Sequence, residues 1–167
     1  GFRDQLQDSL VYLPIDPIKT EEQIRLHARH QFEDGTVLHW WHPISETGLP
    51  TNMTDDLLWL PFILMHYIEP YYDNKNKKDT LFDHSVAAIE KVLTRMSKRG
   101  LTLIGAGDWN DGLSAVGLDM KGESIWLTEF FYMILQKFSE LCKETGKDKL
   151  HKKYSKKASE LKKSFDK

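Results

Sequence analysis

The sequence contains a single cysteine, Cys142, so the chain cannot form a disulfide bond with itself. A lone cysteine near the end of an apolar segment is typical of proteins in a reducing compartment. The sequence also has no secretory signal and no apolar run long enough to span a bilayer. Its longest apolar run, residues 57–65, is short and contains Pro61. These absences predict a cytoplasmic protein with no membrane partner.

Neither sign of charge dominates, with 23 Lys and Arg against 25 Asp and Glu and a net charge of −2. No basic stripe precedes the C-terminal region, so we predict no nucleic-acid partner. The 167 residues amount to one domain or to part of a larger one. Because the sequence starts at Gly1 without an initiator methionine, we expect a fragment of a longer protein.

No strand pattern of any length occurs, and apolar residues instead recur at steps of three and four. Thr20 and Gln23 have the spacing of a capping box and predict a helix that starts at Thr20 and ends near Phe32. Four further helices are predicted: one capped by Thr54, kinked at Pro61 and ending near Pro70, then 80–99, 125–141 and a lysine-rich end, 148–167. The prediction is an all-α fold of about five or six helices arranged as helical hairpins.

The helix at 125–141 has apolar residues over a broad arc of its surface and therefore needs cover on several sides. The residues of this arc are Leu127, Phe130, Phe131, Ile134, Leu135 and Phe138. We expect part of this helix, and part of the Trp40-Trp41 stretch, to be exposed unless another segment or chain covers them.

The segment Gly105–Gly112, with sequence GAGDWNDG, is the most informative part of the chain. It places two carboxylates, an indole and an amide in four consecutive residues, Asp108 to Asp111, and surrounds them with glycines that permit a tight turn. Loops between helices are where catalytic groups often lie. The alternative is a turn in which Asp and Asn cap the next helix, because turns rich in these residues are common.

Three other segments carry candidate binding residues. Arg3 beside Asp4 combines a donor fork with an acceptor, which suits vicinal sugar hydroxyls, although by itself the pair is better explained as a surface ion pair. Trp40 and Trp41 stand between His39 and His42 and are either a platform for sugar rings or part of the core. Asp55 and Asp56 follow Thr54 in a first helical turn, where the helix dipole favours acids.

Two histidines, His27 and His30, stand three residues apart, but no acid with metal-site spacing accompanies them. We therefore predict no metal site.

Five segments in this order resemble glycoside hydrolase family 94: GFRDQLQD, HQFEDGTVLHWWHP, TDDLLWLPF, LIGAGDWNDG and KGESIWL. The resemblance covers about residues 1–135. This family contains inverting phosphorylases of β-linked disaccharides and oligosaccharides, with related domains in cyclic β-1,2-glucan synthases. The HWWHP and TDDLLWLP forms are more similar to the β-1,2-oligoglucan phosphorylase, glucan-synthase and chitobiose phosphorylase branches than to cellobiose phosphorylase.

The resemblance implies that residues 1–167 are a fragment of an (α/α)6-barrel catalytic domain, with its motifs in 1–135. It implies Asp111 as the general acid, Trp109 in the sugar site next to it, and Arg3 and Asp4 as ligands of the same sugar, with their side chains within about 10 Å of Asp111. We add Trp40, Trp41, His42, Asp55 and Asp56 as candidate substrate-binding residues. Inorganic phosphate is the implied co-substrate and no cofactor is implied. The family's phosphate ligands lie, by the resemblance, before Gly1 and beyond Lys167, in the remainder of the barrel.

The implied chemistry needs only one carboxylic acid, because phosphate is itself a nucleophile. Asp111 must then stay protonated, and we expect burial against Trp109 and repulsion from Asp108 to favour this. Two alternatives remain open. One is an inverting hydrolase, which needs a second carboxylate roughly 6.5–9.5 Å away, with Asp55 and Asp56 as candidates. The other is an incomplete or non-catalytic sugar-binding segment.

Overall fold

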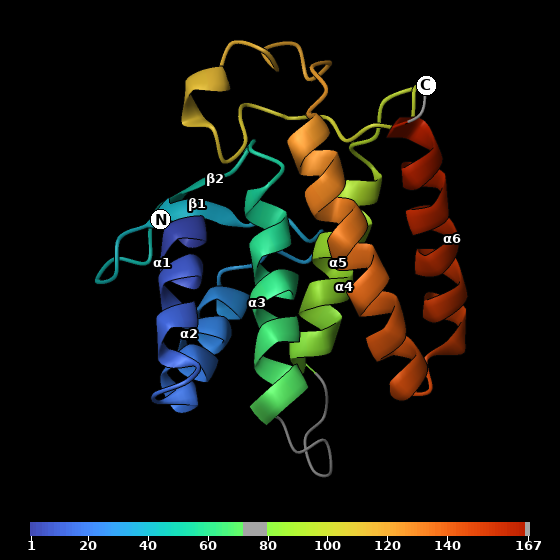
Figure 1. The fold of residues 1–167 in the computed structure, drawn as a ribbon. Coiled ribbons are helices and arrows are strands. Elements are labelled where there is room, and N and C mark those ends of the chain that lie inside the picture. Colours follow the sequence, from blue (N-terminus) through green and yellow to red (C-terminus); the bar gives the residue numbers. More distant parts are fainter. Residues whose placement is uncertain (72–79, 166–167) are drawn as a thin grey trace. The chain divides into compact units, whose positions relative to one another are not determined.

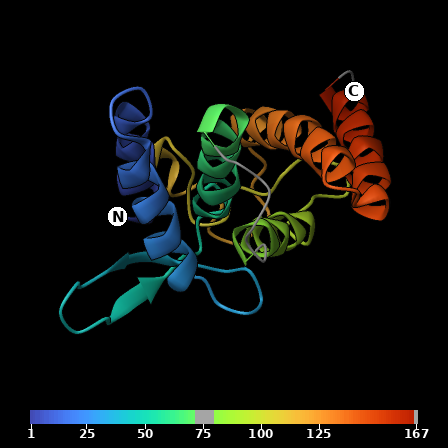
Figure 2. The same ribbon diagram turned by 90° about the horizontal axis from the view of Figure 1, so that it is seen from below.

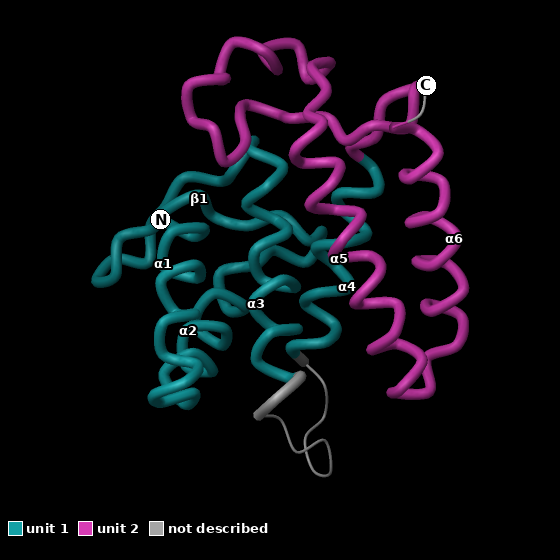
Figure 3. Tube along the Cα trace, viewed as in Figure 1, with its two compact units in different colours: residues 1–94 teal, residues 95–167 magenta. Residues whose placement is uncertain are grey.

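The computed structural model describes residues 1–71 and 80–165 and is mainly helical (Figure 1). The chain forms two compact units, residues 1–94 and 95–167 (Figure 3). The described residues contain six α-helices and one small β-hairpin. The predicted helical fold class is confirmed, whereas the hairpin was not predicted. None of the helices in these described ranges is long and apolar enough to cross a membrane.

Unit 1 consists of two helical hairpins and the β-hairpin. Its helices are α1 (Phe2–Ser9), α2 (Pro17–Arg29), α3 (Asp56–Tyr71) and α4 (Thr80–Leu93), with the short 3-10 helix η1 (Leu10–Tyr12) after α1. The strands are β1 (Leu38–Trp41) and β2 (Gly48–Pro50). In Figure 1, α1 and α2 run antiparallel, as do α3 and α4, and both α1 and α3 begin at the end of unit 1 where the strands lie. This arrangement brings the first turns of α1 and α3 together.

The start of α2 differs from the prediction because a proline takes the first helical position. Pro17 needs no N–H partner there, so it begins the helix three residues before Thr20. Thr20 is buried inside the helix, and its hydroxyl donates to the carbonyl of Ser9 at 2.7 Å. The predicted capping box is therefore wrong, and Thr20 instead ties α2 to the end of α1.

Two other helix boundaries depart from the sequence interpretation. Helix α3 begins at Asp56 and passes through Pro61 to Tyr71, so Thr54 lies before it. Helix α4 starts at Thr80 as predicted but ends at Leu93, because Met96 pairs with Thr102 in an isolated bridge. Helix α1 was missed, since Phe2 and Leu6 are the only apolar residues among its eight.

The β-hairpin was missed because its strands, of four and three residues, are too short for a visible alternation. The strands are antiparallel, and Trp41 pairs with Gly48. Figure 2 shows the hairpin at the edge of unit 1, beside α1 and α2. It directs His39 and Trp41 toward the helices, while Trp40 between them is 49% exposed.

Unit 2 contains a long irregular segment, then α5 (Ile125–Glu144) and α6 (Asp148–Phe165), which form an antiparallel helical hairpin (Figure 1). Ser124 caps α5 as predicted, since its Oγ accepts from the Leu127 N–H at 3.0 Å. The predicted lysine-rich helix is α6, whose buried residues are Tyr154, Ala158 and Leu161. Its predicted last two residues, 166–167, lie outside the described residues.

The broad apolar arc of α5 is buried, since all six residues named for it are buried. Part of the helix is nevertheless exposed, as expected, because the large apolar side chains of Ile125 (53%) and Trp126 (40%) in its first turn are open to solvent. One side of α5 is covered by α6, where the rings of Phe138 and Tyr154 lie 5.9 Å apart. The apolar arc thus predicted the burial of these six residues correctly, and the exposed apolar side chains of α5 lie in its first turn.

Candidate functional site

Asp108 organises the loop that carries the DWND sequence. Its side chain is 3% exposed. Oδ1 accepts from the backbone N–H of Asn110 at 2.9 Å, and Oδ2 accepts from the Ser124 hydroxyl at 2.6 Å. Since Ser124 also caps α5, one carboxylate joins the loop to the start of that helix. Asp108 is therefore a loop-forming residue.

Close backbone approach fixes the base of the same loop. Gly105 has a φ of 70°, which favours glycine. A Cβ at Gly117 would lie 1.7 Å from the carbonyl oxygen of Gly105, so no larger residue fits there without moving the backbone. The two glycines hold the ends of the segment 105–117 against each other.

Asp111 is the first residue of the 3-10 helix η2 (Asp111–Leu113) and is exposed. Asn110 caps this turn, because its Oδ1 accepts from the Gly112 N–H at 3.2 Å. The expected burial of Asp111 against Trp109 is therefore not present, since the turn carries Asp111 to the surface of the loop. The capping alternative therefore holds for Asn110, and Asp111 begins the turn as an exposed residue.

A cavity of about 420 Å³ adjoins this loop, within the size range of ligand pockets. Trp109 and Trp126 line it, with polar groups from Asp108, Asn110 and Glu123. Trp109 is 54% exposed, and its ring centroid lies 6.5 Å from that of Trp126. Trp126 in turn stacks on Phe130 at 5.3 Å. Exposed indole beside polar groups can accept the C–H face of a sugar ring and its hydroxyls.

Sequence reasoning missed Trp126 as a site residue. The signal was present in the KGESIWL segment, but helical periodicity alone does not distinguish an exposed tryptophan from a buried one.

Arg3 and Asp4 lie in the first turn of α1, at the end of unit 1 where α3 also begins. Arg3 is 7% exposed and donates through Nη1 to Asp55 Oδ2 at 3.3 Å and through Nε to Asp4 Oδ1 at 3.4 Å. The Asp4 side chain is 64% exposed. Arg3 thus ties α1 to α3 and orients Asp4, whose carboxylate remains accessible.

Asp55 and Asp56 are fully buried, which helix capping alone does not require. Trp59 Nε1 joins Arg3 as a donor to Asp55 Oδ2, at 3.3 Å. Burial raises the pKa of Asp55 to about 7, and the neighbouring charge of Asp56 adds to this, while Arg3 and Trp59 oppose it. The Oδ1 atoms of both aspartates are buried and have no hydrogen-bond partner among the described residues.

Asp56 joins α3 to the β-hairpin. Its Oδ2 accepts from His39 Nδ1 at 2.8 Å and from the Thr51 hydroxyl at 2.5 Å. The hydrogen bond from His39 to Asp56 raises the pKa of that imidazole. This connection was not visible in the sequence, because it depends on the unpredicted hairpin.

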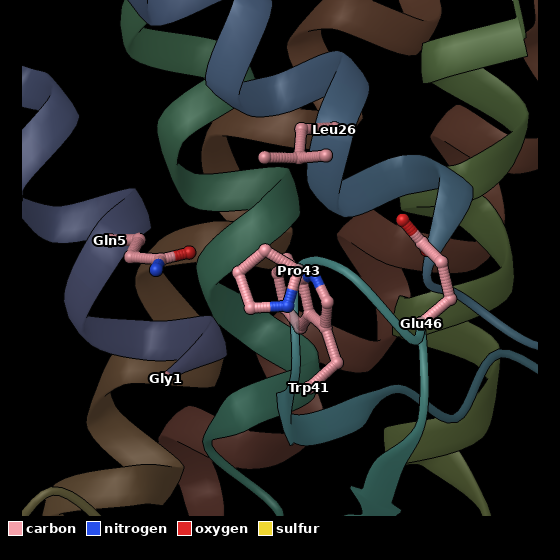
Figure 4. A pocket seen from close by; sticks show the side chains of 6 residues that line it. All are labelled: Gly1, Gln5, Leu26, Trp41, Pro43 and Glu46. Atoms are coloured by element: carbon pink, nitrogen blue, oxygen red, sulfur yellow. The ribbon is translucent and has the colours of Figure 1, made fainter.

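The Trp40-Trp41-His42 stretch divides into packed and exposed parts. Trp41 stacks on His30, with ring centroids 4.0 Å apart, and contacts the ring of His27 at 5.1 Å. Trp40 and His42 are exposed. Figure 4 shows a pocket beside Trp41, lined also by Gln5, Pro43 and Glu46, but its volume of about 120 Å³ is below the range of ligand pockets. Of the two indoles, Trp40 is therefore the one with a free surface for a sugar ring.

The two histidines considered as metal ligands belong to this aromatic cluster. His27 is fully buried and donates through Nδ1 to the Gln23 carbonyl at 2.7 Å; burial lowers its pKa to about 4. His30 is held between the Leu26 carbonyl and Glu46 Oε2, both at 2.8 Å. Across residues 1–71 and 80–165, no group of three or more His, Cys, Asp or Glu is placed to hold a metal ion.

The predicted site residues therefore form two groups. Arg3 and Asp4 lie in unit 1 with Asp55, Asp56 and the Trp40–His42 stretch, and Trp109 and Asp111 lie in unit 2. The proximity of Arg3 and Asp4 to Asp111 stays a prediction.

Replacing Asp108 by alanine should destabilise unit 2 by about 1–3 kcal/mol, because the buried Ser124 hydroxyl and the Asn110 N–H both lose their acceptor. Amide hydrogen exchange in the first turns of α5 measures this as faster exchange in the full-length protein. Asp119→Ala is the matched control, since the Asp119 side chain is 80% exposed in the same segment. Equal exchange in the two variants would contradict the assigned role of Asp108.

Comparison with known proteins places the chain in one family. The sequence profile of the Glycosyl hydrolase 94 superfamily, catalytic domain, matches residues 1–167. The chain is 34% identical over 166 residues to the cyclic beta-(1,2)-glucan synthase NdvB of Rhizobium meliloti (strain 1021), with 83% of the chain and 6% of NdvB aligned. It is 29% identical over 160 residues to solabiose phosphorylase of Paenibacillus borealis, with 89% and 20% aligned. It is 26% identical over 185 residues to N,N'-diacetylchitobiose phosphorylase of Vibrio proteolyticus, with 89% and 22% aligned.

The chain thus spans between 6% and 22% of the length of these three relatives. The profile match, the helical fold and the five segments singled out in the sequence agree. The chain belongs to the glycosyl hydrolase 94 superfamily and carries sequence of its catalytic domain.

Proposed function

We propose that the full-length protein catalyses the reversible, inverting phosphorolysis of a β-glucosidic bond in a disaccharide or oligoglucan. The observation that carries the proposal is the loop in which Asp108 holds the backbone while Asp111 stays exposed, next to a cavity walled by Trp109. The phosphorylases among the relatives support this reaction class. Phosphate is the proposed co-substrate, with no cofactor, and the proposed location is cytoplasmic.

In the proposed reaction Asp111 is the general acid. It gives its proton to the glycosidic oxygen as the bond from that oxygen to the anomeric carbon breaks. Hydrogen phosphate attacks the anomeric carbon from the opposite face, so a β-glycoside yields an α-sugar 1-phosphate. The product phosphate then releases its proton to solvent, and the Asp111 carboxylate takes one up from solvent, which balances the cycle. Substrate and the remainder of the barrel would provide the water-free surroundings that keep Asp111 protonated before the reaction.

The buried state of Asp55 and Asp56 supports phosphorolysis over hydrolysis. A general base in an inverting hydrolase must contact the attacking water. Both carboxylates are fully buried, and each is engaged by two side-chain donors, including Arg3 for Asp55 and His39 for Asp56. Asp55 and Asp56 connect α1, α3 and the hairpin, so we propose that they support the substrate site indirectly, through Arg3 and His39.

The test is product analysis with the full-length protein. It is mixed with inorganic phosphate and, in turn, β-1,2-, β-1,3- and β-1,4-linked glucose disaccharides and N,N'-diacetylchitobiose. We expect an α-sugar 1-phosphate from at least one of them, and the synthetic reaction from that product. Free sugars without sugar phosphate would favour the hydrolase, and binding without turnover would favour a non-catalytic sugar-binding role.

A further inference from the structure

His39 is held at the end of unit 1 where α1 and α3 begin, by an arrangement that leaves one ring nitrogen unused. Its Nδ1 donates to Asp56 Oδ2, and the Thr51 hydroxyl donates to the same oxygen. Asp56 is fully buried, so the acceptor is fixed and the tautomer with a proton on Nδ1 is enforced. Nε2 has no hydrogen-bond partner among the described residues, and the side chain is 34% exposed.

The surroundings of His39 are those of the candidate sugar site. A Cβ built on Gly1 would lie 3.6 Å from the His39 carbonyl oxygen and 2.7 Å from Asp4 Oδ2, so β1 crosses the first turn of α1. The charged groups acting on the imidazole are Asp56 on α3 and Arg3 and Asp4 on α1. Asp56 and Asp4 favour the imidazolium, and Arg3 opposes it. The strand residue His39 therefore passes close to the start of α1, and its ring is within the electrostatic influence of Asp4. The neutral ring, with its proton on Nδ1, accepts at Nε2, whereas the imidazolium donates there.

Other histidines in unit 1 do not share this arrangement. His27 is fully buried. His30 has both ring nitrogens within 2.8 Å of acceptors and stacks on Trp41. His84 is partly buried on α4 and donates from Nδ1 to the neutral amide oxygen of Gln31 at 2.6 Å. Among these four, His39 alone combines a bond from Nδ1 to a buried carboxylate with a second ring nitrogen that has no hydrogen-bond partner among the described residues.

We propose that His39 is a further substrate-contacting residue: as the imidazolium, with Nδ1 donating to Asp56, it donates a second hydrogen bond from Nε2 to a hydroxyl oxygen of the pyranose bound by Arg3 and Asp4. This proposal rests on the proposed function, because it concerns the same sugar. In this proposal Asp56 and Thr51 are positioning residues that orient the His39 ring. A hydrogen-bonded carboxylate behind the ring commonly fixes the orientation of a functional histidine. Asp4 accepts from a neighbouring hydroxyl, so acceptor and donor grip adjacent positions of one ring.

The test measures sugar binding by calorimetry in the full-length protein without phosphate, so that no turnover occurs. The probes are the β-1,2-linked glucose disaccharide and N,N'-diacetylchitobiose. His39→Asn keeps an amide that can reach Asp56 but removes the atom at the Nε2 position. His39→Gln places an amide donor near that position. We expect the Kd to rise about 10- to 100-fold in the asparagine variant, since a hydrogen bond from a charged donor is lost, and several-fold less in the glutamine variant.

A pH series separates substrate contact from a structural role. Because the raised pKa of His39 depends first on its bond to Asp56, wild-type binding should weaken as the pH rises through that pKa, and Asp56→Asn should move this weakening to lower pH. His39→Gln should remove it. His84→Asn, at a histidine of similar burial with its own Nδ1 bond, should leave Kd and the pH profile unchanged.

Equal Kd values in wild type, His39→Asn and His39→Gln would overturn the proposal. If His39→Asn fails to fold, the test rests on the Kd of His39→Gln and its dependence on pH. A pH dependence equal to that of the wild type in His39→Gln would overturn the proposal. Sugar binding by the wild type without any sugar 1-phosphate would refute phosphorolysis while leaving the His39 contact standing. Binding of neither disaccharide by the wild type would overturn both.

Discussion

Asp111→Asn in the full-length protein should reduce the kcat for phosphorolysis of an ordinary disaccharide by about 10²–10⁴-fold, the usual contribution of general acid catalysis. Asparagine is nearly isosteric but has no proton to give to the glycosidic oxygen. Since Asp111 is exposed and Asp108 and Asn110 hold the loop, the substitution should leave folding intact. The measurement is the initial rate of sugar 1-phosphate release under saturating phosphate.

A glycoside with a very acidic phenol as leaving group provides the internal control for this prediction. Such a leaving group departs without protonation, so Asp111→Asn should retain most of the wild-type rate on it. Asp119→Asn, at an exposed aspartate of the same segment, should behave as wild type on both substrates. A variant that keeps more than roughly a tenth of wild-type turnover on the disaccharide would exclude Asp111 as the acid.

Arg3→Met should produce the largest loss of stability in unit 1, because it leaves Asp55 buried beside Asp56 without its cation. Breaking a buried ion pair by removing one partner typically costs about 3–5 kcal/mol. The loss should appear as faster amide hydrogen exchange in α1 and at the start of α3 in the full-length protein. The double variant Arg3→Met/Asp55→Asn should recover much of the loss, because it removes the uncompensated charge as well.

The cost of Arg3→Met should also grow with pH. Burial raises the pKa of Asp55 to about 7, so the native state binds a proton that the unfolded chain releases near its ordinary pKa of 3.8. The free energy of unfolding therefore falls as the pH rises from about 4 through the native pKa. Removing Arg3, which opposes the shift, raises that pKa further and extends the fall to higher pH. Exchange in the variant should be closer to wild type at pH 5 than at pH 8, and the opposite trend would contradict the assignment.

The sequence by itself determined the helical class, the starts of α4 and α5, and the family. Helical periodicity is a local property, so the apolar stripes of α4 and α5 are visible without a structure. The cap at Ser124 is also local, because its acceptor serves an N–H three residues on. The roles of Asp111 and Trp109 came instead from the resemblance of five ordered segments to the family, and they stay predictions.

Only the tertiary structure decided what the polar residues of unit 1 do. The local sequence predicts Asp55 and Asp56 as acids of a first helical turn. In the structure Asp55 is bonded to Arg3, more than fifty residues earlier, and Asp56 is bonded to His39 on the hairpin, so the two acids belong to a buried network. The sequence predicts Thr20 as a helix cap, but its hydroxyl donates to the carbonyl of Ser9 and so joins α2 to α1. These partners are distant in sequence, and the hairpin that brings His39 to α3 has strands too short to leave a pattern. Local propensity therefore determined which segments are helical, whereas burial and long-range hydrogen bonds determined which charged side chains are structural.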